Sequence, residues 1–599
     1  MLLRRLIQTT AALAAAVVTY ALVTLPPAHV KIATPLPDTV VLGAYHIHTT
    51  RSDGAGTPDE VAIAAAKAGL RFAILTDHGD ATRTPDPPRY AHGVLVIDAV
   101  EISTVEGHIA ALGINGPAPY RLGGEARDVI EDVHRLGGIA IVAHPDSPRE
   151  ELRWRPTGTP ATGRQGGPAT DLSGADGIEW MNADSEWRHQ PWTTLVNALL
   201  YLPIRPAESF ATLLDRPTQT LRRWDALTRR RSVIGLSAVD AHGLVAGLYV
   251  TTFQSFAQAV VLDTPLSGDA APDAAHVMSA LRAGRAFGVI TGLADAAVPT
   301  LTARDDTRTV SFGQRLTAPV GRVQIDVALP AAPNARVVLM HNDRAVAEGL
   351  GHASAAGESG AYRAEIWLRV SDRIPWIVTN AVYVDPSSDG VPNSPPSAGT
   401  LSGAGSSAHP AMVTPLPFGS AWTIEHGPSS AGTVEASAGG LAFRWTVGVA
   451  QPGLEFAALA RSMGEGLESF DRVEFSASAD APMRLSVQFR LPGGHDGERW
   501  GRSVYLDGTP RPLVVRMAEL SPQGFSATRR PIVARIKSLL FVLDTLHAAP
   551  GSTGTIHLTD VRLVRSADVN VSGPDGQQQI QRPGQEQQVR RPGGQGGRQ

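Results

Sequence analysis

Two histidines that directly follow a short apolar run could hold a metal ion together. His46 and His48 lie two residues apart after Val40–Leu42, and Asp53 comes in the loop that follows. Residues two apart on a strand point to the same side, so both imidazoles can reach one ion. Imidazole and carboxylate groups are common ligands of divalent metals. The spacing therefore predicts the first part of a metal site.

Later segments repeat this arrangement, an apolar and strand-like run that ends in a histidine or a carboxylate. The polar residues at these run ends are His78, Glu101, His144, Asp240 and His242, and His108 opens one further apolar run. In α/β barrels, functional side chains come from the carboxyl ends of several strands, so these residues are expected to converge. One such histidine alone is more often an ordinary core or loop residue, whereas the whole set predicts a site.

In order, spacing and strand-end context, these segments resemble the motifs of the PHP (polymerase and histidinol phosphatase) family of metal-dependent hydrolases. The motifs, within residues 41–295, are His46-Ile47-His48 with Ser52-Asp53-Gly54, Thr76-Asp77-His78, Ala143-His144-Pro145 and Asp240-Ala241-His242. The stretch Glu101–Thr104 followed by Glu106–His108 is similar to the branch of the family that contains bacterial carbamate-ester hydrolases.

The resemblance implies nine metal ligands at the matching positions. They are His46, His48, Asp53, His78, Glu101, His108, His144, Asp240 and His242. Nine donors exceed what one tetrahedral ion uses, so two or three divalent ions are expected, with Glu101 as the bridge. The chain contains no cysteine. Mixed imidazole and carboxylate ligation suits zinc, manganese or iron, and the sequence does not choose among them.

Paired ions of this kind activate a water molecule, so we expect hydrolysis of a phosphoester, or of a carbamate or ester. Asp77, a candidate catalytic residue, is expected to orient an imidazole, with proton transfer as the alternative role. Arg285, the second candidate, would bind an anionic substrate group at the barrel mouth, or lie on the surface. Glu179 and Asn182 are candidate substrate-binding residues, with a polar strand edge as the alternative.

Strand-like and helix-like segments alternate around these residues. Helices are predicted after the N-cap Thr57 up to Gly69, over about Glu125–Leu136 and over Thr220–Arg230, and each precedes a strand that carries candidate ligands. The alternation predicts a parallel α/β barrel. The expected fold class is α/β, a distorted (βα)7 PHP barrel followed by two all-β domains.

Composition shifts suggest the domain boundaries. The predicted parts are a signal peptide or signal anchor at 1–30, the barrel at 40–295, a small β-sandwich at 296–385, a linker at 386–417, a jelly-roll-like module at 418–566 and a disordered tail at 567–599. Insertions at 146–176 and 186–219 are expected to shape substrate access. The jelly-roll-like module loosely resembles carbohydrate-binding modules, although Trp422, Trp445 and Trp500 are better interpreted as core or rim residues.

The N-terminal segment predicts export. Arg4-Arg5 precedes an apolar run over about Ala11–Leu25 that Pro26-Pro27 closes, which is typical of a signal peptide or a signal anchor. We expect a periplasmic or cell-envelope protein, with a membrane anchor if the segment is retained. The net charge is −4 and no basic stripe precedes the tail, so nucleic acid is not expected as a partner.

Two functions follow from this pattern. The favoured one is an exported metal-dependent hydrolase with a small-molecule substrate. The alternative is a cell-envelope binding protein, in which the β modules bind a glycan and the barrel is a metal-stabilised scaffold.

Overall fold

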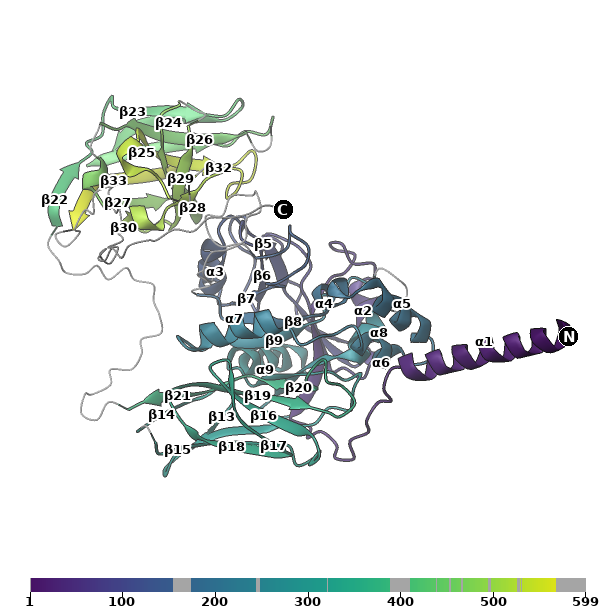
Figure 1. Cartoon of the computed structure of the whole chain (residues 1–599). Coiled ribbons are helices and arrows are strands. Elements are labelled where there is room, and N and C mark those ends of the chain that lie inside the picture. Colours follow the sequence, from purple (N-terminus) through teal and green to yellow (C-terminus); the bar gives the residue numbers. More distant parts are fainter. Residues whose placement is uncertain are drawn as a thin grey trace, which may run out of the picture.

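Strands dominate the chain, and in the residues that the structure describes they form five sheets (Figure 1). The computed structural model describes residues 2–154, 174–243, 248–319, 321–387, 410–437, 439–451, 454–464, 467–493, 497–524, 528 and 530–566. Most of the predicted 146–176 insertion and 386–417 linker, and the predicted tail at 567–599, lie outside the described residues.

Strands and helices alternate in the N-terminal half. The strands are β1 Val40–Ile47, β2 Phe72–Leu75, β3 Arg89–Ala91, β4 Val94–Asp98, β5 Val100–Ser103, β6 His108–Leu112, β7 Ile139–Val142, β8 Gly177–Asn182, β9 Ile234–Ala238, β10 Ala257–Val261 and β11 Ala286–Val289. The helices are α1 Leu2–Thr24, α2 Pro58–Lys67, α3 Ala126–Arg135, α4 Ala183–His189, α5 Trp192–Tyr201, α6 Pro206–Ala211, α7 Thr218–Thr228, α8 Leu248–Ser255 and α9 Ala270–Arg282. The three predicted helices are confirmed as α2, α3 and α7, and Thr57 caps α2 in a capping box with Glu60.

These strands belong to two sheets that meet near the carboxyl end of β1. One sheet has the order β5-β6-β7-β8-β9, and the other runs through β11-β10-β1-β2-β4-β3. At one seam the His48 amide donates to the Ala241 carbonyl, and at the other His78 forms a parallel bridge with Glu101. The ends of β1, β2, β5 and β9 are thereby brought together.

The strand pairing is mixed, which corrects the expectation of a parallel sheet. β6 is antiparallel to β5 and β7, and β10 is antiparallel to β1. The physical reason is the turn Thr104–Gly107, which joins β5 to β6 and is too short for the crossover that a parallel pair requires. The fold class is mixed α/β, and closure into a (βα)7 barrel stays a prediction.

Some of the strands after residue 299 continue the larger sheet, and others form a sheet of their own. They are β12 Thr300–Arg304, β13 Thr309–Ser311, β14 Arg315–Ala318, β15 Val323–Ala328, β16 Arg336–His341, β17 Arg344–Leu350, β18 His352–Gly357, β19 Gly360–Trp367, β20 Ile377–Thr379 and β21 Val382–Pro386. β20 pairs with β11, so β14, β21, β19 and β20 extend the sheet of β1, while β12, β13, β15 and β18 form a separate sheet.

Two further sheets form the C-terminal module. Its strands are β22 Pro410–Pro415, β23 Trp422–His426, β24 Ala431–Ser437, β25 Gly440–Thr446, β26 Phe456–Ser462, β27 Arg472–Ala479, β28 Met483–Arg490, β29 Arg499–Leu506, β30 Arg511–Arg516, β31 Ser521–Pro522, β32 Ser538–Asp544 and β33 Thr553–Ser566. β22 lies inside the predicted linker and pairs with β33. Trp422, Trp445 and Trp500 are buried, so they belong to the core.

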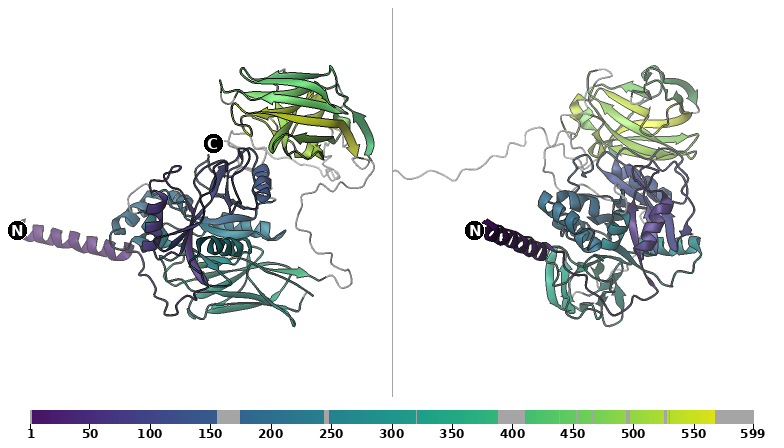
Figure 2. Two further views of the ribbon diagram at one scale, coloured as in Figure 1. Left: turned by 180° about the vertical axis from the view of Figure 1, so that it is seen from behind. Right: turned by 90° about the vertical axis from the view of Figure 1, so that its right-hand side faces the viewer.

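The C-terminal module is seated on α3, as both views of Figure 2 show. Arg484 of β28 is fully buried and donates to Asp132 at 2.7 and 2.8 Å and to Glu131 at 2.9 Å. It also lies 3.3 Å from Asp128, which Arg502 of β29 contacts as well. Charged side chains therefore join two parts of the chain more than 350 residues apart.

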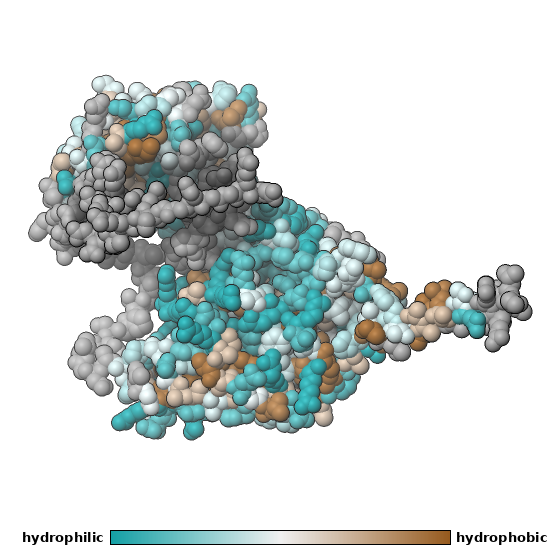
Figure 3. All heavy atoms as spheres, in the orientation of Figure 1, coloured by the Kyte–Doolittle hydropathy of each residue, from teal (hydrophilic) through white to brown (hydrophobic). Residues whose placement is uncertain are grey.

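Helix α1 projects from the body and is largely exposed (Figure 3). Its large apolar side chains Leu13, Val17, Val18 and Val23 are all exposed. None of the helices in the described residues has the length and the apolar content that crossing a bilayer requires.

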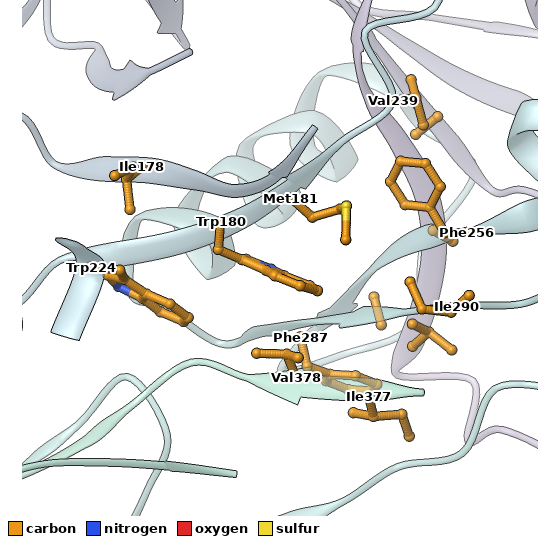
Figure 4. Packing of buried hydrophobic residues seen from close by; sticks show 14 of the residues in the cluster. Ile178, Trp180, Met181, Trp224, Val239, Phe256, Phe287, Ile290, Ile377 and Val378 are labelled. Carbon is orange, nitrogen blue, oxygen red and sulfur yellow. The ribbon is translucent and has the colours of Figure 1, made fainter. Parts of the chain in front are cut away.

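A single core connects the α/β part with the strands that follow it. Trp180 of β8 packs in one layer with Phe287 of β11 and Val378 of β20 (Figure 4). A Cβ atom at Gly288 would lie 2.6 Å from the Trp180 ring, so this glycine makes room for the tryptophan. The predicted sandwich at 296–385 therefore shares both sheet and core with the part that holds the candidate ligands.

Candidate metal centre

Four buried side chains meet where β1 and β9 end and β5 begins. His46 Nε2 lies 3.1 Å from His48 Nε2, and each of these nitrogens lies 3.2 Å from Glu101 Oε2. Asp240 Oδ1 lies 3.5 Å from His46 Nε2 and 3.4 Å from His48 Nε2. Donors about 2.0–2.1 Å from a tetrahedral ion are separated from one another by about 3.3 Å. His46, His48 and Asp240 therefore offer atoms that fit one metal ion, and Glu101 Oε2 lies beside the two histidines.

Glu101 connects this group to a second one through its other oxygen. Glu101 Oε1 lies 2.9 Å from His108 Nδ1 and 2.9 Å from His144 Nε2. His78 Nδ1 lies 3.3 Å from Oε2. A carboxylate with histidines at both oxygens has the arrangement of a bridge between two ions.

Asp53 gathers a third group at the open side of the cluster. Asp53 Oδ2 lies 3.2 Å from His242 Nε2 and 3.7 Å from His78 Nε2. The side chain of Asp53 is 54% exposed and that of His78 is 34% exposed, so solvent reaches this group. The structure thus brings all nine predicted ligands into one cluster.

Three of the nine residues have strained backbone conformations. His46, His144 and Asp240 have φ values of 69°, 30° and 45°. The pairing of β1 with β2 shifts register between Tyr45 and Ile47, so a bulge lies at His46. Non-glycine residues with positive φ persist where their surroundings impose it, and they concentrate at functional sites. This bulge, in addition to the strand spacing, sets the direction of the two imidazoles.

Opposite charges dominate the electrostatics of the cluster. Burial alone would lower the pKa of His46, but the carboxylates around it, led by Glu179, raise that pKa well above its ordinary value. Burial would likewise lower the pKa of His48, but hydrogen bonds led by that with Asp240 raise it to about 11. Divalent ions would take the place of these protons, and metal binding is therefore expected to release protons.

Glu179 orients His46, a role that the sequence did not indicate. Glu179 Oε1 accepts hydrogen bonds from His46 Nδ1 at 2.5 Å and from the Tyr45 hydroxyl at 2.9 Å, which leaves Nε2 facing the cluster. Asn182 Nδ2 donates to Glu179 at 2.9 Å and to Asp240 at 3.1 Å. Both predicted substrate-binding residues therefore position candidate ligands.

Asp77 holds the loop after His48, and this corrects its expected role. Its carboxylate accepts hydrogen bonds from the Thr49 amide at 2.7 Å, the Thr49 hydroxyl at 2.8 Å and the Ser52 hydroxyl at 2.7 Å. None of the hydrogen bonds described for Asp77 reaches an imidazole, because its side chain points to the loop that delivers Asp53. The orienting role belongs to Glu179.

Arg285 lies at the opposite end of β1, which contradicts its predicted place at the mouth. It contacts the Val261 carbonyl and Asp263, and Val261 pairs with Val40 at the start of β1. At about 3.3 Å per residue, the start of the strand lies roughly 20 Å from His46. The misplacement arises because Arg285 precedes β11, which runs parallel to β1, so the arginine lies at the amino end of the strands.

Replacing Arg285 with alanine is therefore expected to leave catalysis almost unchanged. We expect kcat/KM and metal content within about twofold of the wild type, because surface ion pairs contribute little. Steady-state kinetics of the Arg285→Ala variant checks this, and a tenfold rise in KM would return the arginine to the substrate site.

A pocket of about 240 Å³ lies beside the cluster. Its lining residues are His144, Pro145, Asp146, Glu179, Trp180, Asn182, Ser185, Glu186, His189, Asp215, Pro217, Thr218, Gln219 and Thr220. Four of these are carboxylic acids, and none of the lining residues in the described ranges is a lysine or an arginine. Arg223 and Arg373 lie next to the pocket, but they pair with Asp146 and Asp215.

Apart from Glu179, which contacts His46, Glu186 has the least exposed side chain among the carboxylic acids that line the pocket. Burial first, and then the charges of Asp215 and Asp146, raise the pKa of Glu186 to about 7. Because this value lies above the ordinary pKa of the side chain, ionisation opposes folding. The cost is absent below about pH 4.5, grows as the pH rises, and is complete above about pH 7.

A Glu186→Gln variant is expected to remove this pH dependence. Between about pH 4.5 and 7 the wild type should lose up to roughly 3 kcal/mol of stability relative to the variant. Urea unfolding at both pH values measures the difference. An equal stability difference at the two ends of this range would contradict the assignment.

Comparisons with known proteins give limited similarity. No family model matches the chain. The uncharacterized protein MJ1587 of Methanocaldococcus jannaschii is 32% identical over an alignment of 116 residues that covers 17% of this chain and 67% of that protein.

Solved structures resemble parts of the chain only distantly. A two-domain protein from Bacteroides vulgatus that contains a predicted PHP-like metal-dependent phosphoesterase is 12% identical, covers 59% of this chain and 99% of its own, and has a TM-score of 0.28. A family 11 carbohydrate-binding module from Clostridium thermocellum is 13% identical, covers 26% and 96%, and has a TM-score of 0.22. Both TM-scores are too low to support a conclusion about this chain.

Proposed function

We propose that this chain, which belongs to the same family as the uncharacterized archaeal protein MJ1587, is a metal-dependent hydrolase of the PHP type. The observation that carries the proposal is the convergence of nine histidine and carboxylate side chains around Glu101. Five of the nine, His46, His48, Glu101, His144 and Asp240, are buried, and buried charges are costly unless metal ions compensate them.

Three sets of side chains would hold the ions. The sets are His46, His48, Glu101 and Asp240; Glu101, His108 and His144; and Asp53, His78 and His242. Two or three divalent ions bound there would supply an activated water and would stabilise negative charge on the substrate. Glu179 fixes the tautomer of His46, and Asp77 holds the loop that carries Asp53.

The pocket favours a carbamate or ester over a substrate with an anionic tail. Glu186, Asp146 and Asp215 line its wall, and Arg223 and Arg373 are already paired with Asp146 and Asp215. An additional phosphate or carboxylate would find no unpaired cation among these residues, whereas a group with hydrogen-bond donors would find acceptors. We therefore assign the pocket to the part of the substrate that does not react.

Turnover of matched aryl substrates tests this function. We expect the metal-loaded wild type to hydrolyse 4-nitrophenyl N-methylcarbamate or 4-nitrophenyl acetate at least ten times faster than 4-nitrophenyl phosphate or bis(4-nitrophenyl) phosphate. The His46→Ala variant should lose the activity. Faster turnover of either phosphate would show that the protein is a phosphoesterase. Bound metal without turnover of any substrate would indicate that the metal-binding part is a scaffold.

We propose in addition that the protein is exported. Its support is the order Arg4-Arg5, apolar run and Pro26-Pro27 at the N-terminus. For the alternative of a glycan-binding protein, Trp422, Trp445 and Trp500 are buried, as expected from the sequence, and they offer no aromatic platform.

A further inference from the structure

Helix α5 presents an apolar face to solvent. Trp192, Val196, Leu199 and Leu200 are 72%, 50%, 66% and 55% exposed, and Ile204 just beyond the helix is 69% exposed. The spacings of four, three and one place the four helical residues on one side of the helix. The residues of α5 that are buried, Ala198 and Tyr201, face the protein instead.

The C-terminal end of helix α1 contacts α5. The Tyr20 hydroxyl donates to Asn197 at 2.5 Å, and the Thr24 and Tyr201 hydroxyls lie 2.7 Å apart. Tyr201 also donates to the Ala21 carbonyl at 3.2 Å. From this contact α1 projects with exposed apolar side chains of its own, and brown residues lie where the two helices meet (Figure 3).

A contiguous apolar surface of this kind marks an interaction site. Residues 6–30 contain no Asp, Glu, Lys or Arg, and they directly follow Arg4-Arg5. An uncharged segment preceded by basic residues suits the interior and the anionic surface of a bilayer. Trp192 and Tyr20 are the residue types that favour the membrane–water interface.

We infer that the face formed by α1 and α5 docks on an anionic lipid bilayer, with Trp192, Val196, Leu199 and Leu200 embedded in its interface. Only Gln190 and Pro191 separate α5 from α4, which lines the pocket through Ser185, Glu186 and His189. Docking through α5 therefore holds the pocket next to the membrane surface.

An environment-sensitive label on α5 tests the inference in the full chain. The chain contains no cysteine, so Leu199→Cys can be labelled with a nitrobenzoxadiazole dye at that site alone. Asp263→Cys is the matched control, because the native side chain lies just beyond the end of β10 and is 82% exposed. Vesicles of phosphatidylethanolamine and phosphatidylglycerol should shift the emission of the α5 label to the blue and leave the control unchanged.

Two outcomes would overturn the inference. In one, the protein floats with the vesicles while the α5 label stays in water, so that α1 alone binds lipid. In the other, the label is shielded before vesicles are added, so that a second copy of the chain covers the face. A Leu199→Glu/Leu200→Glu variant should bind the vesicles at least tenfold more weakly, with an unchanged circular dichroism spectrum, and unchanged binding would also refute the docking.

Discussion

Replacing Glu101 with glutamine is expected to abolish most metal binding and to lower kcat by more than about 100-fold. The loss of an outer partner alone typically costs about 10–100-fold in metal affinity or activity, and we propose Glu101 as a direct ligand. Its two oxygens face five histidines, at distances of 2.9 to 3.3 Å. The amide keeps the size of the side chain but removes the charge and one of the two acceptors.

Glu151→Gln is the matched control for this change. Glu151 is exposed and pairs only with the neighbouring Arg149 in the described contacts, so its variant should keep wild-type metal content and turnover. Metal analysis and steady-state kinetics of both variants give the comparison. If Glu101→Gln retained its metals and stayed within tenfold of wild-type kcat, Glu101 would not bridge the ions.

Replacing Arg484 with methionine is expected to destabilise the protein by about 3–5 kcal/mol, the range for breaking a buried ion pair by removing one partner. The guanidinium is fully buried between Asp128, Glu131 and Asp132 of α3. Without it, these carboxylates would remain at the contact between the module and α3 with too few partners. The urea concentration at half-unfolding should fall, and limited proteolysis should release the C-terminal module more readily.

Arg516→Met provides the comparison for Arg484. Arg516 pairs with Glu519 at 3.3 Å on the surface, and exposed pairs of this kind contribute less than about 1 kcal/mol. Equal unfolding midpoints for the two variants would show that the buried cluster does not hold the module to α3.

The clustering of the candidate ligands could be predicted because most of them are local features of strand ends. His46, His78 and His144 come at the ends of apolar segments that predict buried strands, and the structure has β1, β2 and β7 at these segments. The ends of neighbouring strands meet at one edge of a sheet, so residues far apart in sequence converge without any knowledge of the loops. For the same reason the helix after Thr57 was predictable from its cap.

Other features depend on contacts that no local pattern contains. Arg285 lies at the amino end of the strands because it precedes β11, which runs parallel to β1, and an arginine after a helix gives no sign of that direction. Glu179 reaches His46 across β8 and β1, and a bulge at His46 sets the geometry. Arg484 meets Asp132 from 352 residues away. Such tertiary pairings are specified by packing rather than by periodicity.

Metal stoichiometry tests the central claim most directly. The full chain is stripped with a chelator, loaded separately with zinc, manganese or iron(II), freed of unbound metal, and analysed for metal per chain. We predict two or three ions per chain with at least one of these metals, and fewer in Glu101→Gln. Less than one ion per chain with all three metals would contradict a multinuclear centre built around Glu101.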